Sequence, residues 1–381
     1  MTTIEAISFT IYEMVNMLLP LVYLFGFVFV LSLVVIVHEG GHFCVARWCG
    51  VHVTEFSLGF GKELWGRNDK KGTRWKICAV PLGGYVKMLG DEDAASSKSS
   101  TDNVPKELRH KTFMAQKLWK RASIIFAGPA TNYLFAFIVL VCMIFFFGIG
   151  QVEPVVGEVI PDSAAEEVGI LKDDRILSIN GENISEFSDL QRQVRILKFG
   201  EPLNLEIQRG DEILNFKVQP KYEEGFDAPL VGVRASQDYY TIRDDIGFWE
   251  SVSLASQQIG MVTKDTLIYL GQIIRHGRLP KEMRGPLGIA EASGDALLSG
   301  ILPLIVFIAN ISLAVGLMNL LPIPLLDGGH LFLYGIEAII RRPLPTILQN
   351  GLMWFGFIVL MGLVGYTFFL DIPRLVQRIF G

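Results

Sequence analysis

Cysteine and charged residues are both scarce in this sequence. Four cysteines among 381 residues are too few for a disulfide-dense secreted scaffold. Charged residues make up 19% of the chain and hydrophobic residues 50%, which excludes the low-hydrophobicity, high-charge profile of a disordered protein. The net charge of −5 gives no overall basis for nucleic-acid binding, so we expect no nucleic-acid partner.

The apolar residues gather into four long runs that contain no Asp, Glu, Lys, Arg or His. Each run has about 20 residues or more, the length that a helix needs to cross the hydrocarbon core of a bilayer. The runs are Leu18–Val37, Ala122–Gly150, Ala296–Leu326 and Gly351–Leu370. Because Pro322 and Pro324 lie in the third run, we expect its helix to end or break before the run does. The sequence therefore predicts four transmembrane helices in a lipid bilayer.

The distribution of Lys and Arg predicts the orientation of these helices. Residues 46–121, between the first two runs, are rich in both, whereas residues 1–17 contain neither. The pair Arg341-Arg342 lies between the last two runs. Since Lys and Arg favour the cytoplasmic side, we expect both of these loops inside and both termini outside. Residues 151–295 then lie outside; they contain no cysteine, so we expect no structural disulfide there.

Two segments between the runs have strand-like patterns. Residues 53–89 contain two such runs around a polar turn at 67–73, which predicts a hairpin. Its many apolar residues favour a sheet that lies against the membrane surface, although an ordinary small subdomain remains an alternative. Residues 91–111 are polar and are typical of a linker.

Residues 152–221 alternate short β-type runs with one helical stretch and contain strong turn signals at Asn180-Gly181 and at 209–211. This pattern resembles one bacterial PDZ domain, a fold that often adds a peptide strand to a sheet edge, so a peptide C-terminus is a possible partner. The run Val155-Val156-Gly157 is a weak candidate for the peptide groove, and a plain edge strand is the alternative. Residues 246–292 predict an amphipathic helical stretch.

The first apolar run leads into His38-Glu39-Gly40-Gly41-His42. On a helix, the two histidines stand one turn apart on one face, so both imidazoles can reach one zinc ion, and Glu39 can act as general base. Arg47 follows only nine residues after His38, so the motif lies at membrane depth, where ionisable groups are costly and usually functional. The alternative is a pair of hydrogen-bonded helix-interface histidines beside an incidental glutamate.

A catalytic zinc site usually has a third protein ligand. Asp327 is the candidate, because it is one of few acidic residues near an apolar run and follows the proline-interrupted backbone at residues 322–324. Its alternative role is to cap a helix that extends to about Ile340. His330 is a competing ligand that we rank below Asp327.

These residues together resemble the site-2 protease family of intramembrane zinc metalloproteases. The motifs that carry the resemblance are HExxH at His38, Glu39 and His42, NxxPxPxLDG from Asn319 to Asp327 and Gly328, and GxxxN at Gly128 and Asn132. The PDZ-like segment, the hairpin and the RGPLGIA stretch before the third run resemble the RseP-like branch, named after the bacterial protease that cleaves anti-sigma factors. RseP in its best-known form has two PDZ domains, whereas this sequence accommodates one.

The resemblance implies a polytopic α-helical membrane protein with a membrane-associated β-hairpin and one inserted PDZ domain. The expected segments are 1–50, the first transmembrane helix with HExxH; 51–119, the cytoplasmic β region and linker; 120–150, the second helix; 151–225, the PDZ domain; 226–295, an extracytoplasmic amphipathic helical region; 296–345, the third helix and LDG loop; and 346–381, the fourth helix and tail. The expected location is the bacterial inner membrane, with the termini and PDZ domain periplasmic and the active site toward the cytoplasm.

The implied activity is zinc-dependent cleavage of transmembrane segments in single-span proteins of the anti-sigma-factor or signal-peptide type. One Zn²⁺ would be held by His38, His42 and Asp327. Asn132 and Asn319 are candidates to bind the substrate backbone or the oxyanion, with interhelical hydrogen bonding as the alternative.

Two other classes stay open. One is a membrane-anchored zincin acting at the cytosolic face, which would need another ligand such as Glu337. The other is a non-catalytic PDZ scaffold or transporter.

Overall fold

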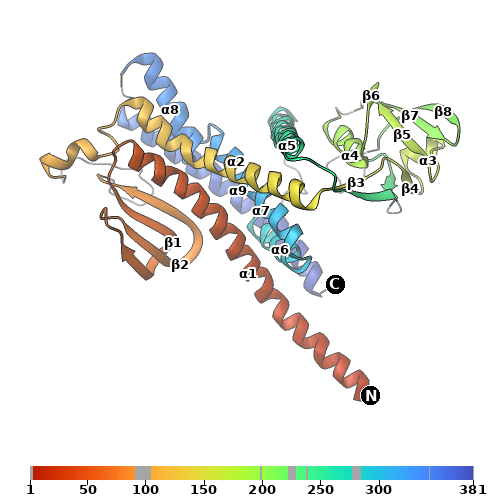
Figure 1. Ribbon diagram of the computed structural model, residues 1–381, viewed down its shortest axis with the longest axis horizontal. Coiled ribbons are helices and arrows are strands. Elements are labelled where there is room, and N and C mark those ends of the chain that lie inside the picture. Colours follow the sequence, from red (N-terminus) through yellow and green to blue (C-terminus); the bar gives the residue numbers. More distant parts are fainter. Residues whose placement is uncertain are drawn as a thin grey trace. The chain divides into compact units, whose positions relative to one another are not determined.

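A computed structural model describes residues 3–90, 104–197, 200–221, 229–236, 239–276, 285–342 and 344–380 (Figure 1). The chain divides into two compact units, of which the first comprises Met1–Leu140 with Arg284–Gly381 and the second Val141–Met283. Thirteen residues of the predicted linker, 91–103, lie outside the described residues. The rest of it contains the 3-10 helix η1 (Lys106–Lys111).

Among the described residues, four helices are long and apolar enough to cross a membrane. The stretches that qualify are Leu19–Trp48 of α1 (Thr3–Trp48), all of α2 (Leu118–Phe147), all of α7 (Ile301–Leu320) and Gly351–Pro373 of α9 (Thr346–Phe380). The prediction of four such helices is confirmed. α1 continues through the His-Glu-Gly-Gly-His motif, as predicted. One boundary was wrong. The third helix begins only at Ile301, because residues 296–298 belong to α6 (Pro286–Leu298).

Small residues let α1 and α6 approach closely in the first unit. A Cβ atom added to Gly26 would lie 3.0 Å from the carbonyl oxygen of Ser293, and one on Gly294 would overlap the ring of Tyr23. The hydroxyl of Tyr23 also donates a hydrogen bond to Asp295 at 3.1 Å. Apolar side chains of α1 and α7 continue this packing, which is typical of helices that associate inside a bilayer; they are Val30, Val34, Leu304 and Ile308.

The predicted hairpin exists as β1 (Val53–Asn68) and β2 (Arg74–Met88), and it is curled. Residues 55–58 of β1 have partners both in 74–77 and in 84–87 of β2. The long strands can bend because glycines such as Gly59 and Gly83 adopt positive φ. Stacked rings of Phe56 and Trp75 pack against Phe43 near the end of α1, and this aromatic cluster attaches the sheet to α1.

The second unit contains a four-stranded sheet in the order β6 (Glu182–Asn183), β5 (Arg175–Ile179), β7 (Leu203–Arg209) and β8 (Glu212–Val218). Two short pairs accompany it: β3 (Ile149–Val152) with β10 (Tyr240–Arg243), and β4 (Val156–Val159) with β9 (Val233–Ala235). Its helices are α3 (Ala164–Val168), α4 (Phe187–Ile196) and α5 (Phe248–His276). Alternate residues of β7 face a common core, as the two-residue period of a strand requires; they are Leu203, Leu205 and Ile207.

Candidate metal centre

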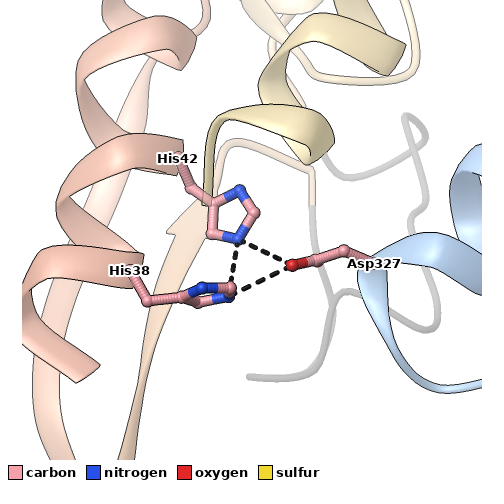
Figure 2. A group of neighbouring side chains, drawn as sticks. All are labelled: His38, His42 and Asp327. Carbon is pink, nitrogen blue, oxygen red and sulfur yellow. Dashed lines mark hydrogen bonds and ion pairs between the residues drawn. The ribbon is translucent and has the colours of Figure 1, made fainter. Parts of the chain in front are cut away.

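His38 and His42 lie one helical turn apart on α1, and both side chains are almost completely buried. Their Nε2 atoms are 3.3 Å apart, and the rings meet edge to face. Figure 2 shows both rings turned toward Asp327, which approaches from the start of α8 (Asp327–Ile340). The four-residue spacing thus brings the two imidazoles to one point, as the sequence predicts.

The loop between α7 and α8 places Asp327. Leu325 adopts a φ of 81°, which is unusual for a branched residue and marks a tightly constrained backbone just before the aspartate. A Cβ atom on Gly328 would lie 2.2 Å from the carbonyl oxygen of Leu321, so only glycine permits this close return of the chain. Leu326, not Asp327, occupies the N-cap position of α8, and no side-chain capping bond is made there. The capping role considered for Asp327 is therefore not its role here.

The three side chains form a nearly regular triangle of ligand atoms. Oδ2 of Asp327 lies 3.1 Å from Nε2 of His38 and 3.4 Å from Nε2 of His42, and the third edge is 3.3 Å. Ligand atoms about 2.0–2.1 Å from a tetrahedral zinc lie about 3.3 Å from one another. The donor set of two imidazoles and one carboxylate is also that of a catalytic zinc site with one open position. Both the spacing and the chemistry of these donors fit zinc.

The rear of each ring contacts α2. Nδ1 of His42 lies 2.8 Å from the carbonyl oxygen of Ile124. A carbonyl can only accept, so Nδ1 carries the proton and the lone pair of Nε2 is left for a metal. Nδ1 of His38 lies 3.3 Å from the side-chain nitrogen of Asn132, a fully buried residue.

Glu39 lies beside this triangle but is not part of it. Its Cγ atom would be 3.2 Å from a Cβ atom on Gly84, so β2 passes directly over the glutamate. The structure therefore holds Glu39 between the metal-ligand triangle and one edge of the curled sheet.

The other candidates do not belong to this group of ligand atoms. Asn319 is the penultimate residue of α7 and is partly exposed. The ring of His330 packs near Tyr334, with centroids 6.5 Å apart. Glu337 forms an ion pair with Arg121 at 3.4 Å. Among the residues that the structure describes, the group of possible metal ligands consists of His38, His42 and Asp327.

Comparison with known proteins decides the family. The model of peptidase family M50 matches residues 26–363. The chain belongs to peptidase family M50. This is the site-2 protease family, so the chain is a zinc metalloprotease with membrane-spanning helices, and zinc is its cofactor.

Several relatives of this M50 protease match almost along their full length. One of them, Atu1380 of Agrobacterium fabrum, is named as a zinc metalloprotease; it is 38% identical over 364 residues, which are 93% of this chain and 96% of that protein. A relative with the same kind of name, R01501 of Rhizobium meliloti, is 39% identical over 91% of this chain and 95% of its own length. Metalloprotease MmpA of Caulobacter vibrioides is 32% identical over 93% and 96%.

Two features of the M50 site were not assigned from sequence. One is the carbonyl of Ile124, since any residue type can supply a backbone oxygen. The other is the space that Gly128 provides: a Cβ atom there would lie 2.3 Å from Nε2 of His42. The regular spacing of 124, 128 and 132 along one face of α2 is the signal that could have indicated a helix face turned toward the histidines.

Proposed function

We propose that this protease hydrolyses a peptide bond within, or at the edge of, a transmembrane segment of a single-span membrane protein. The observation that carries the proposal is the triangle of His38, His42 and Asp327. Two of its members lie inside α1, in a stretch apolar enough to cross a membrane. Substrates of the anti-sigma-factor or signal-peptide type have such segments.

Three residues of the site would bind the metal, and a fourth would transfer protons. His38, His42 and Asp327 would hold the zinc ion, which supplies Lewis-acid polarisation of a carbonyl and lowers the pKa of water. Glu39 would take the proton from the attacking water and deliver it to the leaving amine. Glu39 lies beside the triangle but is not one of its ligands, which supports this role.

The curled sheet supplies a way to present the substrate. A transmembrane helix hides its carbonyl groups, so the scissile segment must unwind before hydrolysis. β2 passes over Glu39 at Gly84, and an unwound segment added as a strand along this edge would lie beside the general base. Asn319 remains a candidate to bind the substrate backbone or the oxyanion.

The same proposal covers the second compact unit and the membrane topology. We assign residues 151–225 to a PDZ domain that either excludes bulky substrates or receives a newly exposed C-terminus. The sheet of β5, β7 and β8 with α4 supports this assignment. Val156 is fully buried and pairs with Ala235, which favours a core strand over the groove role considered for Val155-Val156-Gly157. The Lys and Arg distribution supports an inner-membrane location with both termini periplasmic and the active site toward the cytoplasm.

A reporter assay tests the proposal. Glu39→Gln should stop cleavage of a co-expressed single-span reporter while zinc stays bound, whereas Glu107→Gln on exposed η1 should cleave normally. Undiminished cleavage by Glu39→Gln would remove Glu39 from the mechanism. Asp327→Asn should lower the zinc content of the purified protein; unchanged stoichiometry would place the third ligand elsewhere. A soluble reporter with the same scissile sequence should remain intact, and its cleavage would favour an ordinary zincin.

A further inference from the structure

Asn132 is a buried polar residue whose hydrogen bonding is incomplete in the described part of the chain. It is 0% exposed, and its Oδ1 atom has no hydrogen-bond partner there. Its Nδ2 atom lies 3.3 Å from Nδ1 of His38. A buried amide oxygen without a donor is costly, so this arrangement requires an explanation.

The explanation follows from the proton on His38. If His38 binds zinc through Nε2, as the proposed function requires, its Nδ1 atom must carry the proton and act as a donor. An amide NH₂ group also donates, so it cannot bond to that N–H. The oxygen and nitrogen of an asparagine amide differ little in shape, and the hydrogen-bond network decides which one faces a neighbour. In the zinc-bound protein, the oxygen of Asn132 must therefore face His38.

We propose that Asn132 is a positioning residue for the metal site, and that its Oδ1 atom accepts the Nδ1–H of His38. This bond fixes the tautomer of His38 and turns Nε2 toward His42 and Asp327, the direction in which Figure 2 shows the ring. It also gives the buried oxygen its missing donor. The oxygen thereby lies behind a metal ligand rather than facing a substrate carbonyl.

The geometry of α2 supports this role independently. The carbonyl of Ile124 accepts from Nδ1 of His42 in the same way, at 2.8 Å. Ile124, Gly128 and Asn132 follow one another at four-residue steps and so lie on one face of α2. Gly128 leaves room for the two rings, and the acceptors on either side of it each orient one histidine. One face of α2 thus lies behind both metal-binding imidazoles and orients them.

Zinc affinity of the purified full chain, measured by competition with a chelator, tests the inference. Asn132→Leu removes the acceptor, and loss of such a partner typically weakens metal binding about 10–100-fold. Asn132→Asp keeps an oxygen in place, so its affinity should stay near that of the wild type. Ser312→Ala is the matched control: Ser312 donates to the backbone oxygen of Asn132 at 3.0 Å, and its loss leaves the amide untouched. Its zinc affinity should not change.

Cobalt substitution gives a second readout. The visible absorption of bound Co²⁺ reports the ligand geometry, and we expect it to change in Asn132→Leu and to be retained in Asn132→Asp. A residue that only packs two helices together would leave this spectrum unaltered. Should Asn132→Leu fail to fold, Asn132→Ser takes its place, because serine is too short to reach Nδ1.

Two results would overturn the inference: wild-type zinc affinity in Asn132→Leu, or an equally large loss in Asn132→Asp. His38→Ala separates this inference from the proposed function on which it rests. If His38→Ala binds zinc as tightly as the wild type, the proposed zinc site itself is wrong. If His38→Ala loses zinc and Asn132→Leu does not, only the positioning role fails.

Discussion

Gly128 lies against the imidazole of His42 so closely that a Cβ atom would sit 2.3 Å from Nε2 and 2.6 Å from Cε1. Such a separation is far shorter than any van der Waals contact, and Cε1 of His38 is almost as near, at 2.8 Å. Neither ring can retreat without leaving the metal-ligand triangle. The absence of a side chain at this position is therefore part of the metal site.

We predict that Gly128→Ala lowers zinc occupancy and protease activity together. Overpacking of this kind costs about 1–3 kcal/mol, and here the strain falls on the two ligand rings. Zinc content of the purified protein and reporter cleavage measure the effect. Gly335→Ala on α8 is the control, because an added Cβ atom meets nothing within 4 Å there. Normal zinc content in Gly128→Ala would show that the rings can move aside without loss of the site.

The two glycines of the His-Glu-Gly-Gly-His motif should respond differently to alanine. A Cβ atom on Gly41 would lie 2.4 Å from the carbonyl oxygen of Ala127, so Gly41→Ala should push α1 from α2 and abolish cleavage. Gly40 meets nothing within 4 Å. Gly40→Ala should therefore keep activity and, by its higher helix propensity, stabilise the protein by up to about 1 kcal/mol. Reporter cleavage and thermal unfolding distinguish the two, and equal loss in both variants would contradict this difference in packing.

The sequence predicts the local part of the metal site well and the long-range part less completely. The spacing of His38 and His42 determines their common face through helix periodicity alone. Asp327 could be nominated because acidic residues are rare near apolar runs and because its loop carries prolines. The partners behind the rings, Ile124 and Asn132, depend on how α1 and α2 pack, which no local pattern encodes.

The errors in the fold have physical causes as well. The third span was expected to begin at Ala296 because the apolar run begins there, but residues 296–298 end α6 and the next helix begins at Ile301. The curl of the hairpin was not predicted, because alternation and turn residues indicate pairing only between neighbouring strands. The double partnership of residues 55–58 depends on bends at glycines such as Gly59, whose positive φ could be suspected but not assigned from sequence.

The ion pair of Arg121 and Glu337 should hold α8, the helix that begins with Asp327. Both side chains are largely buried, at 14% and 8% exposed, and Glu337 also accepts the backbone N–H of Leu344 at 3.2 Å. Removal of one partner leaves an uncompensated buried charge, so Arg121→Met should lower stability by about 3 kcal/mol. The double variant Arg121→Met/Glu337→Met should lose less than Arg121→Met alone.

Thermal unfolding in detergent and zinc content test this role of the ion pair. The exposed pair of Arg74 and Glu63 provides the control, since solvent screens this pair and Arg74→Met should change stability much less than Arg121→Met. Equal effects of Arg121→Met and Arg74→Met would show that burial adds nothing to the first pair.

Asp69 should make the attachment of the curled sheet to α1 sensitive to acid. Desolvation acts to raise the pKa of Asp69, but the Arg47 guanidinium, the N–H groups of Thr73 and Lys71 and the indole of Trp75 outweigh it and hold the pKa well below its usual range. A carboxyl group whose pKa is lower in the folded protein contributes stability above its unfolded pKa of about 3.9. That contribution is lost as the pH falls from there toward the folded pKa.

Asp69→Asn should therefore destabilise the sheet at neutral pH and remove its loss of stability below about pH 4. Hydrogen exchange of the β1 and β2 amides, followed between pH 6 and pH 3, measures both effects after correction for the intrinsic pH dependence of exchange. Asp173→Asn, in the other compact unit, is the control for acid effects unrelated to the sheet. If protection of β1 and β2 falls equally with pH in the wild type and in Asp69→Asn, another carboxyl group governs the acid response of this sheet.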